Sequence, residues 1–102
     1  MRQITIDAVR AFRNGNNFKR SNTQVIVDKP EDGNNWRGLR LHGSVIAEMD
    51  SNGDLFLNTH GYMTVTTKER LNGFPSVNIV QKNWIWYLNG VEWDGGRIKV
   101  NW

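Results

Sequence analysis

The chain contains no cysteine and only two prolines among its 102 residues. The missing thiols exclude disulfides and cysteine-ligated zinc, and they favour a reducing compartment. No apolar run approaches the roughly 20 residues that a membrane-spanning helix needs, and the N-terminal segment lacks the apolar stretch of a secretory signal. We therefore expect a soluble intracellular protein with no membrane partner, folded as a single domain over residues 1–102.

Familiar catalytic and metal-binding patterns are also missing. The segment Asp50–Asp54 resembles the start of a calcium-binding EF-hand loop, but Leu55 and Gly61 stand where that loop needs its glycine and its glutamate. The only histidines are His42 and His60, and two histidines without cysteine make a poor zinc site. We expect a polar hairpin tip, structural histidines, and a protein that is not an enzyme and has no metal, cofactor or catalytic residues.

The net charge of +3 is small, but it is concentrated at one end of the chain. Residues 1–20 carry five basic side chains against Asp7 alone, whereas residues 21–102 carry eight basic against nine acidic side chains. Positive charge gathered in one region suggests an anionic partner, of which nucleic acid is the commonest. The alternative is that these charges are the solvated faces of a helix and its following loop.

The pattern at the N-terminus predicts a helix that ends before Gly15. Thr5 is the expected N-cap, and the apolar residues at positions 8, 9 and 12 share one face. A glycine after the last periodic residue supplies the left-handed conformation that ends many helices.

A second, shorter helix is expected over residues 67–72. Thr66 and Glu69 have the spacing of a capping box, and Gly73 and Pro75 follow as terminators.

The remaining apolar runs predict strands, with hairpin turns at Asn52-Gly53 and Asn89-Gly90. A loop with Pro30 and Gly33 as breakers separates the first two strands. The fold class that follows is α+β: a small twisted antiparallel sheet or half-open barrel of about five to seven strands, with an N-terminal helix packed on it and a short second helix. The predicted strands are residues 23–27, 39–49, 55–58, 77–81, 84–88, 91–93 and 97–102.

The second of these hairpins holds three of the five tryptophans. A two-residue loop at Asn89-Gly90 places Trp86 opposite Trp93, and alternation adds Trp84, Leu88 and Val91 to the same side. This face either packs beneath the N-terminal helix or forms a stacking platform for bases, bordered by Arg97 and Lys99. Trp102 is a strand-end anchor or an interface residue.

The segment from Arg13 to Arg20 surrounds one phenylalanine with basic and amide side chains. Such a mixture suits contacts to phosphates and base edges. The alternative is a helix C-terminus whose cations interact with the helix dipole, with Phe18 tucked into the core. The residues expected to contact nucleic acid or another partner are Arg10, Arg13, Phe18, Lys19, Arg20, Arg97, Lys99 and Trp102.

Four stretches, spaced over residues 11–95, resemble a set of short, functionally uncharacterised proteins encoded by tailed phages and prophages. They are "AFRNGNNFK", "LRLHGSVIA", "TVTTKERLNGFPSV" and "VQKNWIWYLNGVEWDG". The resemblance implies a phage or prophage setting and the host cytoplasm as location, and it assigns no functional residues.

Taken with the charge pattern, these features favour a small phage protein that acts by binding. The first hypothesis is nucleic-acid binding through the N-terminal basic patch with help from aromatic side chains. The second is an accessory or anti-defence protein that binds and inhibits a host protein complex. The third is a minor virion or assembly protein, a role that symmetric self-association into a homo-oligomer would favour.

Overall fold

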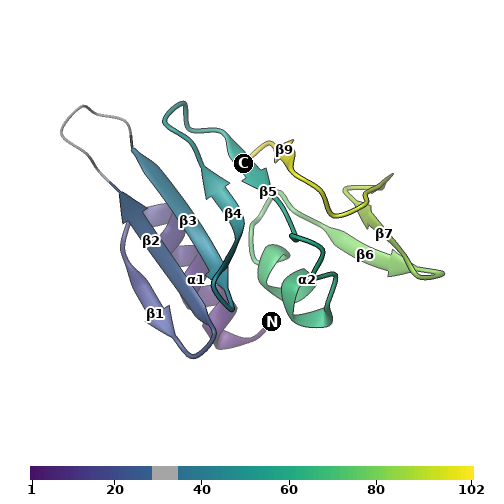
Figure 1. Cartoon of the computed structure of the whole chain (residues 1–102), viewed down its shortest axis with the longest axis horizontal. Coiled ribbons are helices and arrows are strands. Elements are labelled where there is room, and N and C mark those ends of the chain that lie inside the picture. The colour runs from purple at the N-terminus through teal and green to yellow at the C-terminus, as the bar shows by residue number, and fades with distance from the viewer. Residues whose placement is uncertain (29–34) are drawn as a thin grey trace.

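The computed structural model describes residues 1–28 and 35–102 and shows two helices and nine strands within them (Figure 1). The loop predicted around Pro30 and Gly33 lies outside the described residues. The elements are α1 (Gln3–Asn14), β1 (Phe18–Arg20), β2 (Thr23–Asp28), β3 (Trp36–Leu41), β4 (Ser44–Met49), β5 (Leu55–Leu57), α2 (Val65–Leu71), β6 (Ile79–Lys82), β7 (Ile85–Leu88), β8 (Val91–Glu92) and β9 (Ile98–Val100).

The described strands form two antiparallel sheets. The larger has the order β1-β2-β3-β4-β5-β9, and the smaller has the order β6-β7-β8. The predicted α+β class, with an N-terminal helix on an antiparallel sheet and a short second helix, is confirmed. The sheet is open and divided, and it has more strands than expected, because β1 is an additional strand and the predicted strand 39–49 is broken at His42-Gly43.

Helix α1 covers one face of the larger sheet, behind β1, β2 and β3 in Figure 1. Its buried side chains share one stripe, as the periodicity predicts, and Gly15 ends it with φ +70°. The guanidinium of Arg37 donates hydrogen bonds to the carbonyls of Phe12 and Arg13 at 2.9 and 3.0 Å. Two cations therefore lie at the C-terminus of α1: Arg13 in its last turn, and Arg37 from β3.

Thr5 is not the N-cap of α1, and this prediction was wrong. The cap position is Arg2, which makes no side-chain cap hydrogen bond, and Thr5 lies fully buried inside the first turn. Its hydroxyl is bonded to the side chains of Glu69 and Arg70 on α2. The Thr5 hydroxyl, which local sequence rules assign to helix capping, is thus used in a tertiary contact with α2.

The start of α2 also differs from the prediction. Thr64, not Thr66, is the N-cap, and its hydroxyl accepts a 3.1 Å hydrogen bond from the backbone N–H of Thr67. The helix ends at Asn72 in a right-handed conformation, so Gly73 is not needed for positive φ. A Cβ on Gly73 would lie 2.6 Å from Thr5 Cγ2, which shows that this glycine permits close packing against α1.

Arg70 fills the space between α1, α2 and β2. Only 1% of the residue is exposed, and its guanidinium donates to the hydroxyls of Thr5 and Thr23 at 3.0 Å each and to Glu69. Burial lowers the pKa of the Arg70 guanidinium, although the neighbouring Glu69 carboxylate opposes that shift. These bonds satisfy a charge that would be costly to bury alone.

The strand pairing of the tryptophan hairpin is as predicted, but one tryptophan does not lie on the predicted side. Leu88 pairs with Val91 across the Asn89-Gly90 turn, and the rings of Trp86 and Trp93 are buried with centroids 6.3 Å apart. Trp84, however, is 92% exposed, because Asn83 and Trp84 form the turn between β6 and β7. The predicted position of Trp84 on the buried side was therefore wrong.

The tryptophan face lies beside α2, whereas α1, beneath which it was predicted to pack, lies on the larger sheet. Phe12 of α1 contacts the rings of Phe74 and Trp102, at centroid distances of 5.2 and 5.5 Å. Trp86 lies 5.9 Å from the ammonium of Lys68 on α2. The hairpin of β6 and β7 projects beyond α2 at one end of the molecule, which measures 47 × 28 × 22 Å (Figure 1).

Candidate functional site

The larger sheet separates the basic residues predicted from the sequence into two groups. Arg10, Arg13 and Arg20 lie on the side of the sheet that carries α1. Lys19 points to the opposite, uncovered side, since its neighbour Phe18 pairs with the buried Val25. Arg97 and Lys99 also lie on that uncovered side, beside Glu48 and Phe56.

The first group, Arg10, Arg13 and Arg20, is called here the helix-side basic surface. Asp7 is the carboxylate within it: one oxygen lies 2.8 Å from the Arg20 guanidinium, and the other lies 3.8 Å from that of Arg10. The hydrogen bonds from Arg20 and then from Gln3 hold the pKa of the Asp7 carboxyl below its usual range. Three guanidinium charges against one carboxylate leave this surface positive.

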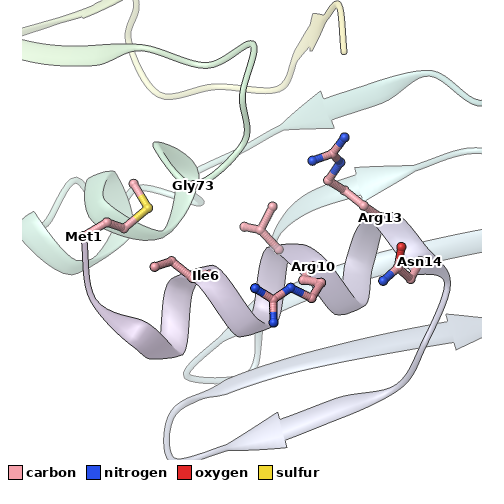
Figure 2. A pocket seen from close by; sticks show the side chains of 7 residues that line it. Met1, Ile6, Arg10, Arg13, Asn14 and Gly73 are labelled. Atoms are coloured by element: carbon pink, nitrogen blue, oxygen red, sulfur yellow. The ribbon is translucent and has the colours of Figure 1, made fainter.

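A groove of 480 Å³ runs along α1 beside the turn at Gly73. Figure 2 shows Arg10, Arg13 and Asn14 along the helix, with Met1 and Gly73 at the other end of the groove. The remaining lining residues are apolar, Ile6 and Val9. The groove thus combines two cationic side chains and an amide with an apolar floor.

The uncovered face of the larger sheet is occupied by a ladder of contacts between its own side chains. The indole of Trp36 donates to Glu48 at 3.0 Å, and the other Glu48 oxygen accepts from Arg97 at 3.2 Å. The Arg97 guanidinium lies 3.8 Å from the ring centre of Phe56. Lys99 Nζ lies 3.3 Å from Asp54. The side chains of Arg97 and Lys99, predicted to border the tryptophan face, are thus paired with Glu48, Phe56 and Asp54.

Two aromatic residues of the predicted site serve the fold. Phe18 packs against the core and lies under the Arg20 guanidinium at 5.1 Å. Trp102 is 44% exposed, but its ring contacts Phe12 and Phe74 and its indole donates to the carbonyl of Gly53 at 3.0 Å. Of the two roles expected for Trp102, the strand-end anchor is confirmed.

The other sequence features also have structural roles. The Asp50 carboxylate accepts from the backbone N–H groups of Asn52 and Asp54 at 3.0 Å each, so this segment is the polar hairpin tip expected, although Asn52 does not adopt the positive φ of a type I′ turn. His42 was predicted within a strand but stands in a turn with φ +51°. His60 Nε2 lies 2.7 Å from the carbonyl of Val45.

A model of the family described as Kyanoviridae Gp96 protein matches residues 1–100. The chain belongs to this family. Because the Kyanoviridae are phages, the phage setting expected from the sequence is confirmed. No curated protein and no solved structure matches the chain.

The Kyanoviridae Gp96 family description names no ligand and no reaction. Sequence reasoning found Arg10 and Arg13 but missed Ile6 and Gly73, which complete the groove. The spacing of Ile6 with Val9 and Arg10 on one helix would have indicated a shared stripe. Nothing local indicates that Gly73, far along the chain, packs against that stripe.

No helix in residues 1–28 and 35–102 of this Kyanoviridae Gp96 family member is long and apolar enough to cross a bilayer. Within the same ranges, no three histidine, aspartate or glutamate side chains gather in a way that would hold a metal ion.

Proposed function

We propose that this protein binds nucleic acid through the helix-side basic surface. The observation that carries the proposal is that Arg10 and Arg13 line one groove, with Arg20 held beside them through Asp7. Guanidinium groups donate several hydrogen bonds in a planar fork and remain charged at any physiological pH, which suits them to phosphate.

The groove has the size and chemistry for one unit of a nucleotide chain. Its volume of 480 Å³ lies within the range of about 300–1,000 Å³ typical of ligand sites. Phosphate would meet Arg10 and Arg13 at the rim, the sugar or base would lie against Ile6 and Val9, and the Asn14 amide offers a donor and an acceptor to a base edge.

Asp7 limits the strength of this interaction. An incoming phosphate competes with the Asp7 carboxylate for Arg20 and Arg10, since the carboxylate already lies within 4 Å of both. Binding is therefore expected to be modest and strongly dependent on salt, because each neutralised phosphate releases condensed counterions. Neutralising three phosphates would give a slope of about −2 to −3 in log K against log salt concentration.

The test is fluorescence anisotropy with labelled oligonucleotides, DNA and RNA, single- and double-stranded, at 50 mM salt. We expect binding by the native protein and about tenfold weaker binding by the Arg10→Ala/Arg13→Ala variant. The matched control is Arg97→Ala/Lys99→Ala, which removes two charges from the uncovered face of the sheet and should change affinity little. No binding at low salt, or equal losses in both variants, would overturn the proposal.

The proposal is for a binding protein that catalyses no reaction and works in the host cytoplasm. Its basis is the family membership and the charge of the α1 side, with nucleic acid as the partner of matching chemistry. Inhibition of a host protein complex and a role as a minor virion or assembly protein, alone or as a homo-oligomer, are the alternative functions. The helix-side basic surface is charged rather than apolar at its rim, which favours nucleic acid over either of them.

A further inference from the structure

Four loops of the described residues place two consecutive residues in the left-handed region. They are His42-Gly43, His60-Gly61, Asn89-Gly90 and Asn83-Trp84, with first-residue φ values of 51°, 52°, 51° and 52°. The second residue is glycine in three of them, at φ 82° to 85°. In the fourth it is Trp84, at φ 68°.

Tryptophan is a poor choice for this position on grounds of folding alone. The Cβ of a bulky residue is crowded in the left-handed region, which is why glycine is normal at the second place of such turns. The indole of Trp84 does not stabilise the fold. The residue is 92% exposed, and its indole makes no hydrogen bond or aromatic contact with another described residue. Backbone strain and full exposure together point to a role outside the fold.

The surroundings of Trp84 indicate what it contacts. Val80 and Ile85, on the two strands that this turn joins, are also exposed, at 47% and 38%. Aliphatic side chains offer no flat face to a nucleic-acid base, but they pack well against another protein. Lys82 is the only charged residue within residues 79–88, so this hairpin is apolar and cationic.

We propose that the tip of the β6–β7 hairpin is a docking site for a second, different protein. Trp84 inserts into an apolar pocket of that partner, and Lys82 faces a carboxylate at the pocket rim. Tryptophan is the residue type that most often anchors such interfaces, where it fills a desolvated pocket. The proposal goes beyond nucleic-acid binding, and its residues are distinct from those that line the α1 groove.

The first step of the test places a photo-crosslinking amino acid, benzoylphenylalanine, at Val80 in the full chain. The labelled protein is irradiated in lysate of phage-infected host cells, with Trp84 intact and with Trp84→Gly. Glycine removes the indole and suits the turn, so the variant should fold with an equal or higher Tm. We expect a crosslink to one other protein that disappears in Trp84→Gly and persists in Arg10→Ala/Arg13→Ala.

The second step identifies that protein by mass spectrometry and titrates it, in purified form, into the native chain. Emission of the exposed Trp84 should shift to the blue and become protected from iodide. We expect Trp84→Gly to weaken binding by about 30-fold or more, Trp84→Phe to weaken it less, and Lys82→Glu to weaken it measurably. The control Lys19→Glu, a charge reversal distant from the hairpin, should leave binding unchanged.

Several results would overturn this inference. They are the absence of any crosslink from Val80, a crosslink to a second copy of this chain or to nucleic acid, and a crosslink that survives Trp84→Gly. If the native protein bound no oligonucleotide but still gave the Val80 crosslink, the proposed nucleic-acid function would be wrong and the docking site would still be supported.

Discussion

The guanidinium of Arg70 donates a 3.0 Å hydrogen bond to the hydroxyl of Thr5, and this bond joins α2 to the first turn of α1. The same guanidinium reaches Thr23 on β2, so one buried cation ties three elements together. Because α1 carries Arg10 and Arg13, and the turn after α2 carries Gly73, this junction positions both walls of the groove.

Arg70→Met should therefore destabilise the protein by about 3 kcal/mol, since the Glu69 carboxylate loses its cation and two buried hydroxyls lose the donor that Arg70 supplies, while the apolar stem is kept. Urea unfolding followed by circular dichroism measures the change. Arg20→Met is the matched control, because its exposed ion pair with Asp7 is worth only about 0.5 kcal/mol. Equal losses in the two variants would contradict the role given to Arg70.

Gly73→Ala should destabilise the protein by about 1–3 kcal/mol. Its new Cβ would lie 2.6 Å from Thr5 Cγ2 and 2.7 Å from Val9 Cγ2, so these two short side chains or the backbone that carries them would have to shift. Thermal unfolding is the measurement. Gly43→Ala separates packing from turn strain, because Gly43 has open space around it but a φ of +84°. A neutral Gly73→Ala would show that α1 and the turn after α2 are less tightly packed than described.

The Asp7 carboxyl should titrate below its usual value of about 3.9, and Arg20→Ala should raise its pKa, because the hydrogen bond from Arg20 is the largest cause of the shift. A pKa that is lower in the folded state adds stability above the unfolded-state pKa, and this stability is lost as pH falls through the folded-state pKa. Side-chain carboxyl chemical shifts measured by NMR between pH 2 and 6 report the titration. An unchanged pKa in Arg20→Ala would rule out the assigned cause.

Asp7→Asn should strengthen oligonucleotide binding and steepen its dependence on salt, because the substitution releases Arg10 and Arg20 from their carboxylate. Glu48→Gln is the control, since it releases Arg97 on the uncovered face of the sheet. Anisotropy titrations of both variants make the comparison. A gain for Glu48→Gln alone would move the binding surface to the other side of the sheet.

Trp84→Gly should leave the free energy of unfolding unchanged or raise it by up to about 1 kcal/mol. Relief of left-handed strain, worth about 1–2 kcal/mol, is partly offset by the greater freedom of glycine in the unfolded chain. The expected rise in Tm is between zero and about 6 °C for a domain of this size. A large fall in Tm would mean that the indole serves the fold.

Much of the fold follows from local sequence rules, because its signals lie within a few residues. Gly15 ends α1 and Asn89-Gly90 sets the register of β7 and β8, as predicted, since both depend only on backbone geometry. Thr5 was wrongly predicted to be an N-cap because its hydroxyl is hydrogen-bonded to a buried arginine 65 residues away, which local rules do not take into account. Asn83-Trp84 was missed because tryptophan carries no turn signal.

The candidate site was only partly predictable for a related reason. Charge clustering along the chain identified Arg10, Arg13 and Arg20, but it also grouped them with Lys19, which alternation sends to the other side of β1. Arg97 and Lys99 were placed beside the tryptophans, whereas pairing of β5 with β9 brings Lys99 opposite Phe56. Strand pairing over long separations decides such neighbours, and periodicity does not encode it.

The salt dependence of oligonucleotide binding by the native protein tests the central claim most directly. Anisotropy titrations from 25 to 200 mM salt, roughly the range in which phosphate contacts dominate, give log K against log salt concentration. The helix-side basic surface predicts measurable binding at the lowest salt and a slope of about −2 to −3. No binding at the lowest salt, or affinity that does not change with salt, would contradict it.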